Sequence, residues 1–317
     1  MANIISIAAI AAALLLAASS AGQSHAENYG VDVSFPIHNK FIAVGGERTG
    51  DLSQSRSVFG EDRIKTYGTY IAGCEKHYGR TQQAHLCQEG ENSRFEYNTQ
   101  QPRGVKNHTD IGFRKTRLSD ETWTMLQEFW SEIRLNHDND KKREEDGLPF
   151  PDGLPRENWP TGNIYVNHWA KPTHHTSVQI NQELTEAIWR ELESKMRLWI
   201  PHAQIFTRSD IYGIRVYRNG HILAPHVDRD PLVSSAIINV DQDGLAEPWP
   251  LEVYDHEGVA HNITIEPGEI ILYESHSVIH GRPFALKGDY YANIFVHFKP
   301  HFEGFEDYYQ DETEGEL

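Results

Sequence analysis

Short apolar segments separated by turn signals fill residues 211–298, and they constrain the fold more than any other feature of the chain. Four segments rich in β-branched and aromatic residues lie at 211–217, 234–240, 269–273 and 290–298. Asn219-Gly220 and Pro267-Gly268 are turn signals that lead into further strands. Repeated short strands with turns between them predict a mainly β protein with a jelly-roll, or double-stranded β-helix, core.

Two histidines and one aspartate within this region have the residue types of a metal site. His226 and Asp228 are two residues apart in a segment with strand character, so we expect both side chains on one face of a sheet. A distal histidine in a later loop, His280, completes a set of two imidazoles and one carboxylate. This set suits non-haem Fe(II) with open coordination positions. His276 is the rival for the distal position.

The motif formed by these residues resembles a known family. His226-x-Asp228 followed by His280-x-x-Pro283-Phe284 resembles the prolyl 4-hydroxylase type of Fe(II)/2-oxoglutarate-dependent dioxygenase, and the pattern favours His280 over His276. The resemblance implies that His226, Asp228 and His280 hold the iron. It also implies 2-oxoglutarate and O2 as co-substrates, ascorbate as reductant, and hydroxylation of a peptidyl proline or another peptide side chain.

The chain departs from this family at the residue that pairs with the far carboxylate of 2-oxoglutarate. The family has a Lys or Arg where this chain has Tyr290. Because a buried carboxylate without a cationic partner is costly, a basic residue is expected elsewhere. The nearest basic residues are Arg215, Arg282 and Lys287. We expect the anchor at Lys287 or Arg215, with Tyr217 or Tyr290 able to add a hydrogen bond but no charge.

Two amphipathic helices are expected beside the barrel. Ser119 has the residue type of an N-cap and precedes two acidic residues and a stripe of apolar ones at helical spacing. A second helix is expected over roughly 182–199, starting near Asn181. Segment 163–169 has the character of a strand. Residues 27–117 read as a loop-rich N-terminal extension in which no element can be placed.

The beginning of the chain and its cysteines both point to export. Residues 1–26 hold an apolar run shorter than the about 20 residues of a membrane span, and then Ser24-His25-Ala26, a small-x-small cleavage signal. We predict a signal peptide and a place in the secretory pathway, with an uncleaved anchor as the alternative. Cys74 and Cys87 are the two cysteines of the chain, and we expect them to form a disulfide in an oxidising compartment.

The net charge of the chain limits the classes of partner that it can bind. The chain carries 29 basic and 46 acidic side chains and a net charge of −17, which argues against nucleic acid or an anionic membrane as partner.

The expected organisation is a signal peptide (1–26), an N-terminal region with the disulfide and one helix (27–155), a dioxygenase domain (156–302) and an acidic, disordered tail (303–317).

Two other classes of function stay open at this point. A metal-dependent jelly-roll enzyme of other chemistry needs His-x-Asp but not 2-oxoglutarate. A non-catalytic binding module that has lost its co-substrate anchor fits Tyr290. Trp249, in a segment rich in Pro and apolar residues, is expected either at the mouth of a substrate site or packed in the core.

Overall fold

The computed structural model describes residues 37, 61–79, 82, 85–138, 165–167 and 176–303. The expected signal peptide and the tail beyond residue 303 therefore lie outside the described residues. Within the described ranges, no helix combines the length and the apolar character needed to cross a membrane.

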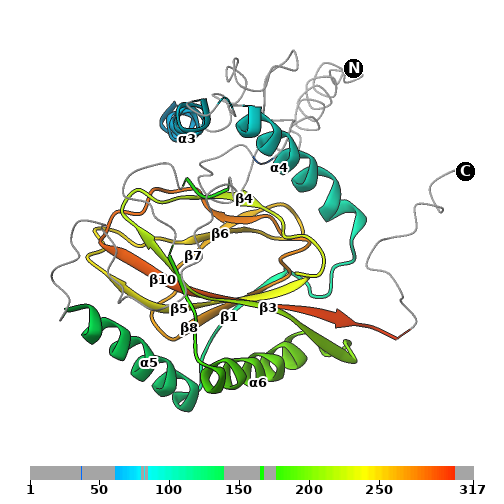
Figure 1. Ribbon diagram of the computed structural model, residues 1–317. Coiled ribbons are helices and arrows are strands. Elements are labelled where there is room, and N and C mark those ends of the chain that lie inside the picture. Colours follow the sequence, from blue (N-terminus) through cyan, green and yellow to red (C-terminus); the bar gives the residue numbers. More distant parts are fainter. Residues whose placement is uncertain are drawn as a thin grey trace, which may run out of the picture.

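Two antiparallel sheets face each other and form the centre of the molecule (Figure 1). The larger sheet has the strand order β1 (Phe113–Arg117), β8 (Glu269–Tyr273), β5 (Ser234–Asp243), β10 (Tyr290–His301), β3 (Ile205–Arg218) and β2 (Thr176–Val178). The smaller sheet has the order β4 (Leu223–His226), β9 (His280–Arg282), β6 (Leu251–Tyr254) and β7 (Ala260–Ile263). This architecture confirms the predicted jelly-roll core, mainly β with flanking helices.

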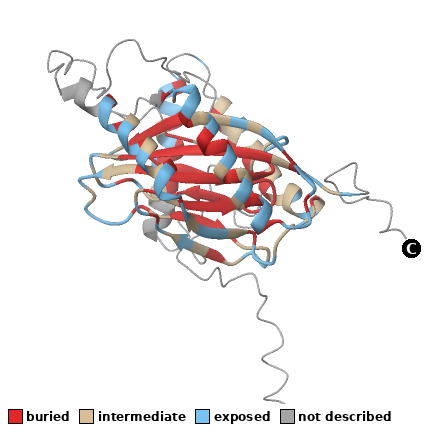
Figure 2. Cartoon of the chain, turned by 90° about the horizontal axis from the view of Figure 1, so that it is seen from below, coloured by how far each residue is buried: buried red, intermediate tan, exposed pale blue. Residues whose placement is uncertain are grey.

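Successive side chains along the strands of the larger sheet point to opposite faces, so its residues contribute to two separate layers. In β3, Ile214 and Val216 belong to the outer core, whereas Tyr217 belongs to the core between the sheets and Arg215 lines a cavity there. The period of two in a strand produces this division. The central strands are buried along most of their length (Figure 2). A polar side chain at an inward position therefore enters a dry interior.

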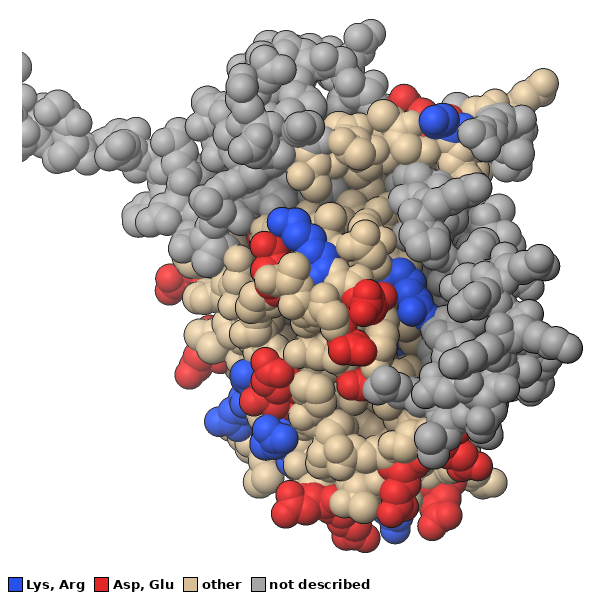
Figure 3. Space-filling view, turned by 90° about the vertical axis from the view of Figure 1, so that its left-hand side faces the viewer, with Lys and Arg blue, Asp and Glu red and all other residues tan. Residues whose placement is uncertain are grey.

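Helices α5 (Asp120–Asp138) and α6 (Gln182–Trp199) cover the outer face of the larger sheet (Figure 1). The Asn181 side chain accepts a hydrogen bond from the Leu184 backbone N–H at 2.9 Å, and the Ser119 hydroxyl accepts one from Thr122 at 3.3 Å. Both helices and both N-caps are thus as predicted. Acidic side chains gather at the lower end of the face shown in Figure 3.

Two further helices lie over the smaller sheet, in the extension where the sequence allowed no element to be placed. They are α3 (Glu61–Gly79) and α4 (His85–Gly104) (Figure 1). The buried face of α4 includes Glu91, Arg94 and Asn98. A helix that buries polar residues has no apolar stripe, so the usual periodic signal is absent from its sequence.

Only the middle of the expected strand over 163–169 lies within the described residues. Of its residues, 165–167 are described, and Val166 forms an isolated β-bridge with Leu223. The Asn167 side chain, rather than a backbone ladder, donates to the Gly220 carbonyl at 2.8 Å and accepts from the Ile222 N–H at 2.9 Å. An amide side chain can pair with backbone in this way because it carries both a donor and an acceptor.

A disulfide between Cys74 and Cys87 joins α3 to α4 across 13 positions of the chain. Disulfides of this kind are typical of oxidising compartments. We expect Cys74→Ser to lower the free energy of unfolding by about 3 kcal/mol, because a loop of this length is constrained in the unfolded chain. Urea unfolding of the variant and of reduced wild type measures this, and the two should agree. An unchanged midpoint in both would contradict it.

Candidate metal centre

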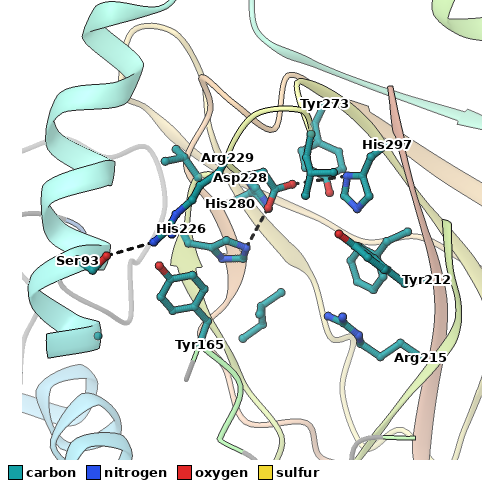
Figure 4. Close-up of a pocket in the computed structure, with 15 residues that line it drawn as sticks. Ser93, Tyr165, Tyr212, Arg215, His226, Asp228, Arg229, Tyr273, His280 and His297 are labelled. Atoms are coloured by element: carbon teal, nitrogen blue, oxygen red, sulfur yellow. Dashed lines mark hydrogen bonds and ion pairs between the residues drawn. The ribbon is translucent and has the colours of Figure 1, made fainter. Parts of the chain in front are cut away.

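Two neighbouring strands of the smaller sheet carry the candidate ligands. β4 and β9 pair in antiparallel fashion, and His226 lies directly opposite His280. Two details differ from the sequence-based expectation: His280 begins strand β9 instead of lying in a loop, and Asp228 follows the end of β4 instead of lying within it. The turn after His226 nevertheless brings the aspartate carboxylate back to the two rings (Figure 4).

The structure brings His226, Asp228 and His280 together at one point. One ligand atom from each lies within 4.8 Å of the others. Nε2 of His226 is 3.5 Å from Oδ1 of Asp228, and Nε2 of His280 is 3.9 Å from the same oxygen. All three side chains are largely withdrawn from solvent. These separations suit three donors arranged around one ion.

The backbone selects the tautomer of both histidines. Nδ1 of His226 lies 2.8 Å from the Ala224 carbonyl, and Nδ1 of His280 lies 3.0 Å from the Val278 carbonyl. A carbonyl only accepts hydrogen bonds, so in each ring Nδ1 carries the proton and donates. The lone pair of the neutral imidazole is then on Nε2, the atom that faces Asp228. Orientation by a carbonyl is the arrangement usual for metal-binding histidines.

Burial and neighbouring groups shift the pKa values of His280 and Asp228 toward the protonation states that a metal needs. Burial lowers the pKa of His280 to about 4, so this ring is neutral at physiological pH. Burial alone would raise the pKa of Asp228, but the neighbouring imidazoles of His226, His280 and His297 hold it well below its ordinary value. One anionic carboxylate and two neutral imidazoles fit a divalent cation with open positions.

A cavity of about 460 Å³ opens on the three ligands and reaches between the sheets. Arg215 extends into it from β3, on the side opposite α4 (Figure 4). This arginine is 6% exposed, and its guanidinium lies 4.9 Å from the centre of the Phe295 ring. Tyr212 and Tyr165 also line this cavity. The cavity thus has the Arg215 cation on one side and the candidate ligand set, with Arg229 beside it, on the other.

The other basic residues near the site, and Tyr290, lie away from this cavity. Arg282 is buried and donates to the Trp249 carbonyl. The Lys287 side chain is 61% exposed and pairs with Glu247 at 2.9 Å. The Tyr290 hydroxyl donates to Asp241, and its ring packs on the helix side of the larger sheet. None of these three residues is among those that line the cavity. Tyr290 occupies an outward position of β10, because the inward positions are taken by residues of the other parity.

Trp249, Tyr217 and His276 lie near the core but not among the ligands. Trp249 donates from Nε1 to the Phe284 carbonyl at 2.6 Å and lines a separate cavity of about 260 Å³. Tyr217 packs against it at 5.0 Å between ring centres and is fully buried. Nδ1 of His276 lies 3.1 Å from the Asp228 carbonyl. His276 thus contacts the backbone of the ligand loop.

His297 is a residue of the site that sequence reasoning missed. Its Nδ1 is 3.8 Å from Oδ2 of Asp228 and 2.6 Å from the hydroxyl of Ser235. Ser275 donates to the Leu232 carbonyl, so Ser235 donates to Ser275 and accepts from His297 Nδ1–H. The strand period could have found this residue, since His297 shares its face of β10 with Phe295.

Glycine at position 281 is required for β9 to lie against β4. A Cβ there would meet backbone atoms of Pro225 at 2.7 Å and the Leu223 carbonyl at 2.8 Å. We expect Gly281→Ala to separate the two ligand strands, at a cost of about 1–3 kcal/mol in unfolding free energy, and to weaken metal binding. Thermal unfolding and Co(II) titration measure both. Gly68→Ala is the control, because nothing lies within 4 Å of the added methyl; equal metal affinity in both variants would refute this role.

Comparison with known proteins finds similarity among solved structures. No family model matches the chain, and no curated protein sequence matches it. A Pseudomonas putida prolyl-4-hydroxylase shares 16% identity over 60% of this chain and 92% of its own, with a TM-score of 0.37. A 2OG-Fe(II) oxygenase family oxidoreductase from Burkholderia pseudomallei shares 12% identity over 58% and 94%, with a TM-score of 0.36.

A third structure was solved with a peptide. The prolyl hydroxylase of Trichoplax adhaerens, in complex with a hypoxia inducible factor oxygen degradation domain peptide fragment, shares 16% identity over 59% of this chain and 84% of its own. Its TM-score is 0.35. Prolyl hydroxylases and another 2OG-Fe(II) oxygenase are therefore among the structures to which this chain is similar.

Proposed function

We propose that the chain is an Fe(II)- and 2-oxoglutarate-dependent dioxygenase. The observation that carries this proposal is the convergence of His226, Asp228 and His280 within 4.8 Å at a buried cavity, with both Nε2 lone pairs directed at the same point. Two imidazoles and one carboxylate leave coordination positions open for a co-substrate. A structural metal site instead closes its coordination sphere with protein ligands.

Arg215 is the proposed anchor for the far carboxylate of 2-oxoglutarate. Two arginines line the cavity: Arg229 follows the candidate ligand Asp228 and donates to Ser93 of α4, whereas Arg215 enters from β3 on the side opposite α4. Lys287 instead pairs with Glu247 at the surface. A buried guanidinium can bind a carboxylate through two parallel hydrogen bonds. His226, Asp228 and His280 would hold the metal that takes the keto-acid end of the co-substrate, and Arg215 would take the distal carboxylate.

Bound Fe(II) and 2-oxoglutarate supply the oxidation: O2 is consumed, 2-oxoglutarate becomes succinate and CO2, and one oxygen atom enters a substrate C–H bond. The protein's own residues orient the three ligands, anchor the co-substrate and exclude water from the cavity. We propose a peptidyl proline or another peptide side chain as substrate, ascorbate as reductant, and a location in the secretory pathway, in keeping with the disulfide.

Formation of succinate tests this function. Purified protein is incubated with Fe(II), 2-oxoglutarate and ascorbate, and succinate is measured for wild type and Asp228→Ala. Succinate from wild type alone is the expected result. Metal binding without succinate in the presence of candidate peptides would favour a metal-dependent jelly-roll enzyme of other chemistry. Absence of both would favour a non-catalytic binding module.

A further inference from the structure

Helix α4 contacts the backbone that carries the first metal ligand. Arg94 donates from Nη1 to the Pro225 carbonyl at 2.9 Å, and Asn98 donates from Nδ2 to the same carbonyl at 3.0 Å. Pro225 immediately precedes His226. Both donors are buried. Two hydrogen bonds therefore fix the Pro225–His226 peptide unit, which carries the His226 side chain.

The same helix contacts the backbone of the second ligand and of the loop before the third. Gln101 donates from Nε2 to the Asp228 carbonyl at 2.7 Å and to the His276 carbonyl at 2.7 Å. His276 lies four residues before His280, in the loop between β8 and β9. One side-chain amide thus bridges the two segments that approach the metal centre from different strands, and both of its N–H donors are used.

These contacts come from one face of α4. Arg94, Asn98 and Gln101 are spaced by four and three residues, which places them in a row along a helix. Further hydrogen bonds hold Arg94 in place. Glu91 accepts from Arg94 through both carboxylate oxygens, at 2.9 and 2.7 Å, and accepts a hydrogen bond from the Tyr67 hydroxyl of α3 at 2.8 Å. α4 also borders the cavity, where Ser93 accepts a hydrogen bond from Arg229 (Figure 4).

We propose that α4 is a positioning element of the metal centre, with Gln101 as its central residue. The inference rests on the proposed metal site and goes beyond it, because it makes the N-terminal extension part of that site. Gln101, Asn98 and Arg94 donate to backbone carbonyls of the ligand-bearing segments, and we infer that they thereby set the positions of these peptides. Metal ligands must be held to a fraction of an ångström, so a shift of these peptides weakens the site even when the fold persists.

The test compares two adjacent glutamines of the same helix. Gln101→Met keeps the length of the side chain but removes both donors, whereas Gln100→Met makes the same change at an exposed position. Purified full-length protein is titrated anaerobically with Co(II), and the ligand-field absorption gives both affinity and coordination geometry. We expect Gln101→Met to bind Co(II) about 10–100-fold more weakly, the range seen for residues that orient metal ligands, with an altered spectrum. Gln100→Met should match wild type.

Apo-protein unfolding separates positioning from general stability. A Gln101→Met protein that folds with near wild-type stability but binds Co(II) weakly supports the proposal, and Gln101→Asn, whose amide is one methylene short, serves if the first variant does not fold. Wild-type affinity and spectrum in a folded Gln101 variant would overturn the inference and leave the metal site intact. Failure of wild type to bind Co(II) would instead overturn the proposed function.

Discussion

Asp228→Ala is expected to abolish succinate formation and to weaken metal binding by more than 10²-fold, since even residues that merely orient ligands contribute about 10–100-fold. The substitution removes the one carboxylate among the three converging ligands and leaves two neutral imidazoles. Their lone pairs alone neither balance the charge of a dication nor define a three-point site. Isothermal titration with Mn(II) or Co(II) measures the affinity, and succinate analysis measures turnover.

Asp230→Ala is the matched control for this experiment. Asp230 lies two residues further along the same loop, and its side chain is 41% exposed and pairs with Lys299. Its loss changes the charge of the loop by the same amount but removes no ligand, so metal affinity should stay close to that of wild type. Retained metal binding and turnover in Asp228→Ala would contradict the ligand assignment.

Arg215→Met is expected to raise the KM for 2-oxoglutarate roughly 10²-fold, with a smaller change in kcat at saturating co-substrate. A hydrogen-bonded ionic contact to a buried guanidinium contributes about 2–3 kcal/mol, which corresponds to that factor. The methionine keeps apolar contact with Phe295, over whose ring the guanidinium now lies. Initial rates of succinate formation at varied 2-oxoglutarate provide the measurement.

Two further variants make the anchor assignment specific. Arg215→Lys keeps the charge but cannot form the bidentate hydrogen bonds of a guanidinium, so its KM for 2-oxoglutarate should fall between those of wild type and Arg215→Met. Lys287→Ala removes the competing cation, which lies at the surface beside Glu247, and should leave KM unchanged. A raised KM in Lys287→Ala together with a normal one in Arg215→Met would reverse the assignment.

The core of the fold could be predicted from the sequence because its signals are local. β-branched segments with turns between them define β3, β5, β8 and β10, and an N-cap followed by an apolar stripe defines α5 and α6. Helix α4 lacked such a signal, whereas α3 carries one that sequence reasoning missed, since Tyr67, Tyr70, Ile71, Cys74 and Tyr78 are buried at helical spacing. The buried face of α4 carries Glu91, Arg94 and Asn98, whose partners come from distant parts of the chain.

The candidate site could be predicted from the sequence only in part, because some of its residues come together only in the folded chain. The pair His226 and Asp228 was suggested by residue type and spacing, and His280 by the family resemblance, but which basic residue faces them depends on strand parity and on the three-dimensional fold. Arg215 occupies an inward position of β3, whereas Tyr290 occupies an outward position of β10. Spacing along the chain favours Lys287 as readily as Arg215, and only the fold separates them.

The most direct test of the central claim is the position of the metal itself. Anomalous diffraction at the iron edge, from crystals grown anaerobically with Fe(II), locates the ion without reference to activity. We predict one site bounded by Nε2 of His226, Nε2 of His280 and a carboxylate oxygen of Asp228, each about 2.0–2.2 Å away, as is typical for such ligands on a divalent metal. Iron bound elsewhere, or an imidazole of His280 outside its coordination sphere, would contradict the account.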